Sequence, residues 1–183
     1  DPSGGVFYPE RFENNFVFND LTHKGALTAI RIEGPTNSVD QRISRLVKEL
    51  SLLENEYSVL DNFQTDLFWG KTRNLEVFSN LKNNLLRVIV PVSETLNVIQ
   101  KLKKYEINYF LDWGGNLIWL ELETISLKIL REIKEITQEH SGYFTIIKLE
   151  DDLKASADIF TIDPIKYKIS EKIKKSFDPK RIF

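Results

Sequence analysis

Hydrophobic runs and helical repeats alternate through the middle of this 183-residue chain. Residues 85–90 form a short run rich in branched side chains, which predicts a mostly buried strand. A helix is expected over residues 93–105, because Leu96, Ile99 and Leu102 recur at helical spacing. The pattern therefore predicts a buried strand followed directly by an amphipathic helix.

A Gly-Gly pair then separates two further strand-like segments, residues 107–112 and 116–122. Adjacent glycines supply the positive φ angles of a tight hairpin, so these two strands are expected to pair antiparallel. A second helix over residues 124–140 and a last strand over residues 143–149 complete the pattern. The order β-α-β-β-α-β predicts a ferredoxin-like unit over residues 85–149.

Part of the same order appears upstream. Residues 5–8 and 26–33 read as strands, and Ser38 with Gln41 has the spacing of a capping box that opens the next helix. A short strand over residues 57–59 would close this second unit. Its opening strand and helix are missing, so we expect a partial unit and a chain that is truncated at its start.

The chain is expected to form a single α+β domain in which helices cover an antiparallel sheet. Between the two units, a helical linker carries Phe63, Leu67, Trp69 and Phe78 as apolar anchors. We expect a partial ferredoxin-like unit over residues 1–61 and a helical linker over residues 62–84. A complete ferredoxin-like unit over residues 85–149 and a C-terminal helix with its tail over residues 150–183 would follow.

The C-terminal helix is expected to start at Pro164, with Ile165, Ile169 and Ile173 on one face. Residues 164–183 contain seven lysines and arginines against two acids. Cations near a helix C-terminus complement the helix dipole, which is the ordinary explanation of such an excess. The same charges would also attract phosphate or a negatively charged partner surface.

Composition excludes several classes of function. The chain has no cysteine and two histidines in no metal-ligand spacing, so no protein-bound metal is expected. A net charge of −2 gives no reason to expect nucleic-acid binding. No apolar run reaches the roughly 18 residues of a membrane span, and the start lacks the pattern of a signal peptide. A cytoplasmic protein is the resulting expectation.

No catalytic template of a self-contained enzyme appears in the sequence, so whether the chain acts as an enzyme stays open. Glu121 and Glu123 alternate at the end of a strand, which is typical of a solvated edge. Trp113 is an unusual choice beside two glycines; it is either a core or interface aromatic or a cover for a planar ligand. Arg87 interrupts an apolar strand, where it would bind a carboxylate or form a structural ion pair.

Five segments carry a resemblance: Asp1–Pro9, Leu27–Gly34, Leu86–Pro91, Asp112–Leu120 and Phe177–Phe183. In matching order, they resemble segments of the FAD-binding subunits of glycolate oxidase, within the vanillyl-alcohol-oxidase-type superfamily. Among the family's segments are an Asp-Trp-Gly-Gly hairpin and an Arg-x-x-Val-Pro strand. Phe7 and Tyr143 stand where the family often has histidine, which puts an inherited acid or base role at both positions in doubt.

The resemblance implies the C-terminal cap domain of an FAD-linked oxidoreductase that acts on a small 2-hydroxy acid such as glycolate. FAD would be bound mainly by an N-terminal domain that this chain lacks, so the chain alone would be inactive. Arg87 and Tyr143 would face the substrate, and Trp113, Lys180 and Arg181 would face the cofactor. Partners would be a second flavin subunit and an iron–sulfur subunit, in a complex that is peripheral to the inner membrane.

Two alternatives remain from the sequence. The chain would serve as a module that assembles subunits, with Trp69, Trp113 or the basic C-terminal helix at the contact. It would otherwise be a free-standing ferredoxin-like domain that binds a small ligand.

Overall fold

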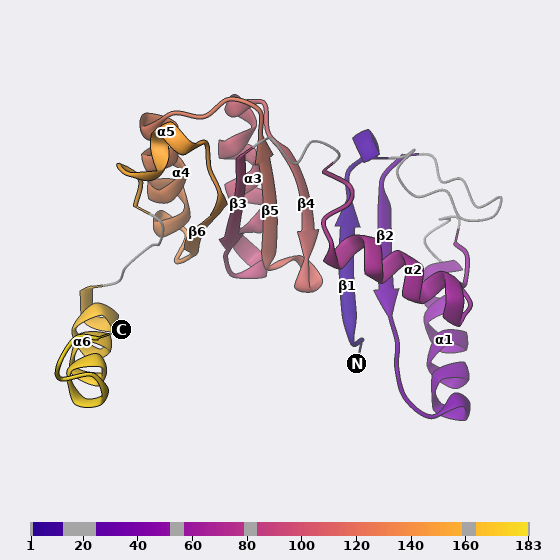
Figure 1. The fold of residues 1–183 in the computed structure, drawn as a ribbon. Helices are drawn as coiled ribbons and strands as arrows, with labels where there is room; N and C mark the ends of the chain where they lie inside the picture. The colour runs from indigo at the N-terminus through magenta and orange to yellow at the C-terminus, as the bar shows by residue number, and fades with distance from the viewer. Residues whose placement is uncertain (1, 13–24, 52–56, 79–83, 159–163, 183) are drawn as a thin grey trace.

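The computed structural model describes residues 2–12, 25–51, 57–78, 84–158 and 164–182. Its described strands form one six-stranded antiparallel sheet in the order β2-β1-β4-β5-β3-β6, and the fold class is α+β as expected (Figure 1). The strands are β1 (Gly4–Tyr8), β2 (Leu27–Arg31), β3 (Asn84–Ile89), β4 (Asn108–Asp112), β5 (Leu117–Leu122) and β6 (Tyr143–Lys148).

The described helices are α1 (Thr36–Leu50), α2 (Asn62–Arg73), α3 (Thr95–Leu102), α4 (Leu127–Glu139), α5 (Asp151–Lys154) and α6 (Pro164–Phe177). Short 3-10 turns precede α3 (η3, Val92–Glu94) and follow β4 (η5, Trp113–Gly115). In the part of the chain that these elements cover, no helix is both long and apolar enough to cross a membrane.

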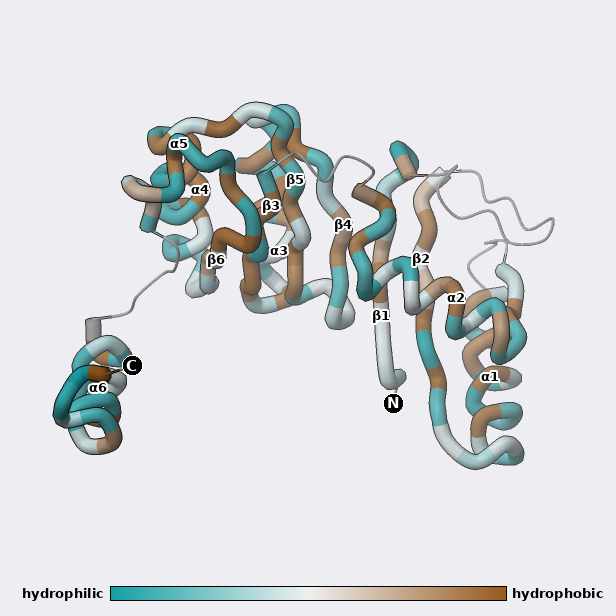
Figure 2. Tube along the Cα trace, viewed as in Figure 1, coloured by the Kyte–Doolittle hydropathy of each residue, from teal (hydrophilic) through white to brown (hydrophobic). Residues whose placement is uncertain are grey.

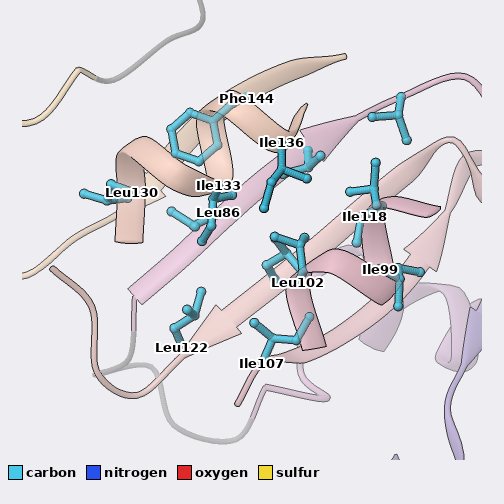
Figure 3. Packing of buried hydrophobic residues seen from close by; sticks show 14 of the residues in the cluster. Leu86, Ile99, Leu102, Ile107, Ile118, Leu122, Leu130, Ile133, Ile136 and Phe144 are labelled. Atoms are coloured by element: carbon cyan, nitrogen blue, oxygen red, sulfur yellow. The ribbon is translucent and has the colours of Figure 1, made fainter. Parts of the chain in front are cut away.

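The ferredoxin-like unit is formed by β3-α3-β4-β5-α4-β6, with β3 between β5 and β6 in the sheet. Its strands lie within one residue of the expected bounds at either end. Leu86, Val88 and Val90 point to one side, where they pack against α3 and α4 as the sheet alternation requires. Figure 3 shows this core, in which Leu102 and Ile133 are fully buried.

The strands β1 and β2 extend this sheet beyond β4. The link is narrow: Phe7 of β1 is paired with Leu111 of β4, while β1 and β2 pair along their full lengths. A second apolar cluster forms on the sheet face opposite α3 and α4, where Phe68 of α2 and Phe110 of β4 both contact the ring of Tyr8. The helix α2 therefore covers one half of this face.

Several local expectations were wrong. Residues 57–61 form no strand, so the partial unit lacks its expected closing strand. Ser38 lies inside α1, whose N-cap is Pro35 without a side-chain bond, while an unexpected capping box at α2 joins Asp61 and Gln64. The capping motif Ser-x-x-Gln was present in the sequence, but the N-cap of α1 lies three residues earlier, at Pro35 instead of Ser38.

Burial also departed from expectation on three helical residues. Leu96 of α3 is 68% exposed, whereas Val98 is buried and takes its place against the sheet. Phe63 and Leu67 of α2 are exposed, and its contact with the sheet comes from Phe68 and Trp69. Ile99 and Leu102 of α3 are buried as expected, so only Leu96 departs on that helix, whereas α2 turns Phe63 and Leu67 away from the sheet.

Candidate functional site

One face of the sheet carries the residues of the candidate site. Along β3, Leu86 and Val88 are buried beneath α3 and α4, so the intervening Arg87 and Ile89 lie on the opposite face. The register places Trp119 of β5 directly opposite Arg87. On this face α2 covers the β1 and β4 half, and Arg87 lies on the other half of the sheet.

Arg87 lies between two indole rings. Its guanidinium carbon is 4.8 Å from the ring centroid of Trp113 and 6.0 Å from that of Trp119. A guanidinium over an aromatic face is attracted by the ring quadrupole, and it keeps its in-plane N–H groups available for a ligand. We call Arg87, Trp113 and Trp119 the Arg–Trp cluster.

The Arg87 side chain has an unsatisfied donor. Its Nε is buried and has no hydrogen-bond partner among the described residues, and no ion pair of Arg87 is formed with any of them. The structural ion pair that was one interpretation of Arg87 is therefore not found there. A buried guanidinium N–H without an acceptor costs free energy of about 1–3 kcal/mol.

Trp113 is held in an uncommon backbone conformation. Its φ is +52°, its ring is 55% exposed, and its backbone N–H donates to Asp112 Oδ1 at 2.7 Å. A bulky residue in the left-handed region carries strain of roughly 1–3 kcal/mol, and such strain is concentrated at functional sites. The structure thus directs a large aromatic ring outward at the end of the hairpin.

The turn that carries Trp113 is supported from two sides. A Cβ on Gly5 of β1 would lie 3.3 Å from the Cα of Gly114, so the glycine permits a close backbone approach. On the other side, the buried Thr95 donates its hydroxyl to the carbonyl oxygen of Gly115 at 2.6 Å. Sequence reasoning missed both supports, because neither contact leaves a spacing signal.

The segments that carried the family resemblance meet here. β1 pairs with β2, its Gly5 touches the Gly114 turn, and Arg87 of β3 stacks on the ring before that turn. Asp1 and Phe183, at the outer ends of the first and last segments, lie outside the described residues. Four segments far apart in sequence therefore lie in one sheet.

Tyr143 lies next to the cluster, at the start of β6. Tyr143 pairs with Ile89 of β3, which lies two residues after Arg87 on that strand. Tyr143 is 45% exposed. The ammonium of Lys166 in α6 lies 4.1 Å from the ring centroid and donates a hydrogen bond to the Tyr143 hydroxyl. A cation therefore accompanies the phenol at this end of the sheet.

Lys180 and Arg181 are not brought to the Arg–Trp cluster. Both lie in the tail after α6, and Arg181 Nη2 is 3.5 Å from Glu171 Oε2 of the same helix. Their expected role at a cofactor stays a prediction, and it requires a ligand or domain that reaches the end of α6.

A second arginine on the same face provides a useful comparison. Arg31 of β2 lies 6.0 Å from the ring centroid of Trp69, and its Nε is also buried without a hydrogen-bond partner. Arg31 differs from Arg87 in its partner, because its Nη2 lies 2.8 Å from Glu33 Oε1.

Glu121 contradicts the expectation of a solvated edge. Only 5% of its surface is exposed, and its Oε2 accepts a hydrogen bond of 2.8 Å from Asn108 Nδ2. The register explains this, because Glu121 faces Leu85 and Asn108 in the middle of the sheet while Glu123 lies beyond the end of β5.

His140 has a carboxylate partner. Its Nδ1 lies 2.6 Å from Glu94 Oε2, and this hydrogen bond holds the pKa of Glu94 below its ordinary value. Among the described residues, no three histidine, aspartate or glutamate side chains gather as metal ligands. His23 lies outside the described residues.

The Arg–Trp cluster combines groups that suit a planar anion. The Arg87 guanidinium supplies N–H donors, and the exposed indole of Trp113 supplies a flat apolar surface beside them. A guanidinium beside an exposed indole has the chemistry to accept either a carboxylate or the ring system of a flavin. No protein-family model and no curated protein matches the sequence.

Proposed function

We propose that the chain is the substrate-side cap domain of an FAD-linked oxidoreductase subunit that oxidises a small 2-hydroxy acid. The observation that carries the proposal is the Arg87 guanidinium, which lies over the rings of Trp113 and Trp119 on one sheet face and forms no ion pair with any described residue. Arg87 would bind the carboxylate of the substrate, and Trp113 would cover the planar cofactor.

The roles of the individual residues follow from their positions. Lys166 over Tyr143 keeps positive charge near the acid, and the Tyr143 hydroxyl lies where the family often has histidine. The Tyr143 hydroxyl would orient the substrate by hydrogen bonding. When bound, FAD would supply the redox chemistry, by accepting a hydride equivalent from the substrate.

The rest of the assembly belongs to the same proposal. An N-terminal domain would hold most of the FAD, and the subunit would pass electrons on within a complex with a second flavin subunit and an iron–sulfur subunit. Such a complex would work in the cytoplasm, at the inner membrane.

A first test measures FAD binding by the purified chain. We expect no tight stoichiometric binding, because the proposal assigns most of the FAD contacts to another domain and the cluster offers one covering ring. Stoichiometric binding with a micromolar or lower Kd would contradict the assignment of the cofactor to another domain.

A second test measures oxidation of the 2-hydroxy acid by the complete subunit and its Arg87→Lys variant. Lysine keeps the charge but loses bidentate binding, so we expect KM to rise about tenfold with a smaller change in kcat. The matched control is Arg31→Lys, which alters the other cation–aromatic pair on the same face. Equal KM values in the Arg87 and Arg31 variants would contradict the role of Arg87.

A further inference from the structure

The helix α6 exposes a continuous apolar stripe. Its four members recur every fourth residue, so they lie within an arc of about 120° on the helix. Figure 2 shows hydrophobic and hydrophilic residues interleaved along this helix. The stripe residues and their exposed fractions are Ile165 (70%), Ile169 (53%), Ile173 (54%) and Phe177 (87%).

Positive charge is concentrated on the same helix. α6 contains five lysines and one glutamate, so it carries a charge of +4 in a chain whose total is −2, and the remainder carries −6. Lys172 lies close to one side of the stripe, and Lys174 lies on the other side. The single acid, Glu171, is next to Arg181. The helix is therefore a basic amphipathic segment on an acidic body.

The position of α6 leaves the stripe accessible. In Figure 1 the helix lies to one side of the sheet. Lys166, in the first turn, contacts β6, while Ile169, Ile173 and Phe177 follow along the helix without becoming buried.

These observations distinguish between two kinds of partner. Protein interfaces are depleted in lysine, whereas a helix that lies in a membrane interface combines large apolar residues with lysines that reach the lipid headgroups. We propose that α6 binds directly to the surface of an anionic membrane, with the stripe inserted among the acyl chains. This inference does not depend on the flavin or on the Arg–Trp cluster.

Cosedimentation of the full chain with lipid vesicles tests the proposal. Vesicles of phosphatidylcholine alone are compared with vesicles that contain 30% phosphatidylglycerol, a composition chosen as the anionic probe, at low and high salt. We expect binding to the anionic vesicles, at least tenfold weaker binding to the neutral ones, and a marked loss at high salt, because surface charges are screened.

Two matched variants separate the stripe from the charge. Ile169→Asp places a carboxylate in the stripe, and Tyr167→Asp places the same charge about 140° from its centre, at a residue that is equally exposed (52% against 53%). We expect Ile169→Asp to reduce vesicle binding at least tenfold and Tyr167→Asp to reduce it less than threefold. Helix content, measured by circular dichroism, checks that both variants keep α6.

Several outcomes would overturn the proposal. The full chain would fail to bind anionic vesicles, or it would bind neutral and anionic vesicles equally well. Equal losses of vesicle binding in Ile169→Asp and Tyr167→Asp would also overturn it, because charge alone would then be the cause. Self-association of the chain that Ile169→Asp abolishes, without vesicle binding, would assign the stripe to a protein contact. None of these results would bear on FAD or substrate binding, which are measured without lipid.

Discussion

Gly142 joins α4 to β6 at a position with no room for a side chain. A Cβ built there would lie 2.5 Å from Val90 Cγ1, 2.7 Å from the carbonyl oxygen of Ile89 and 2.8 Å from Thr137 Cγ2. The Gly142 N–H also donates to the carbonyl oxygen of Thr137 at 2.8 Å, which closes the end of α4. The strand β6 therefore approaches β3 because this residue is glycine.

Gly142→Ala is expected to lower the free energy of unfolding by about 2–3 kcal/mol. Overpacking of a well-packed core costs roughly 1–3 kcal/mol, and the upper part of this range applies because one of the three close atoms belongs to the backbone of β3. The added methyl group would push apart the paired residues Ile89 of β3 and Tyr143 of β6. Because Ile89 is two residues from Arg87, this shift would reach the neighbourhood of the Arg–Trp cluster. Equilibrium unfolding in urea measures the change.

The matched control is Gly70→Ala in α2. A Cβ on Gly70 would meet no atom within 4 Å, so alanine there is expected to raise the free energy of unfolding by about 0.5–1 kcal/mol. Opposite signs for the two substitutions support the packing of β6 against β3. A change below about 0.5 kcal/mol in Gly142→Ala would refute it.

Two further predictions concern titration and stability. Burial raises the pKa of the Tyr8 phenol, whose hydroxyl donates a hydrogen bond to Thr72 Oγ1 at 2.8 Å. The neutral, buried Tyr8 side chain therefore contributes fully to the free energy of unfolding below pH 10, and this contribution is lost as the pH rises further. Absorbance at 295 nm should show this tyrosine ionising only as the chain unfolds, and early ionisation of all six would contradict its burial. The hydrogen bond from His140 lowers the pKa of Glu94. The ionised Glu94 therefore contributes to the free energy of unfolding above pH 4.5, and this contribution is lost as the pH falls below that value. Thermal unfolding from pH 6 to pH 3 should show a smaller fall in Tm for Glu94→Gln than for the unchanged chain; parallel curves would argue against the pair.

Local sequence signals predicted the complete ferredoxin-like unit well. The branched run at β3, the glycine pair after β4 and the helical repeats of α3 and α4 each depend on neighbours within a few residues. The hairpin prediction was confirmed in detail, since Trp113, Gly114 and Gly115 all have positive φ. These elements were predictable because propensity and tertiary packing favour the same conformation.

The misses have a common physical cause, which is that tertiary contacts decide burial. Leu96 and Val98 are both apolar and fit a helical repeat, and only the docking of α3 on the sheet decides that Val98 is the buried one. Glu121 looked like an edge residue because its partner Asn108 is remote in sequence. Short-range patterns do not contain this information.

The candidate site was predictable only in part. The unusual chemistry of Arg87 on an apolar strand and of Trp113 beside two glycines was visible in the sequence, and the structure brings these two side chains together. The supporting contacts of Gly5 and Thr95 were not visible, because they join residues about 110 and 20 positions apart in the chain. The location of Lys180 and Arg181 likewise depends on where α6 lies.

The most direct test of the Arg–Trp cluster uses the three indole N–H signals of the chain, from Trp69, Trp113 and Trp119. Titration with lactate at constant ionic strength, followed by proton–nitrogen correlation spectra, reports on each ring separately. The account predicts that the Trp113 and Trp119 signals shift with saturation, that the Trp69 signal stays in place, and that Arg87→Lys weakens the response. Unmoved signals for Trp113 and Trp119, or equal shifts of all three rings, would contradict a carboxylate site at Arg87.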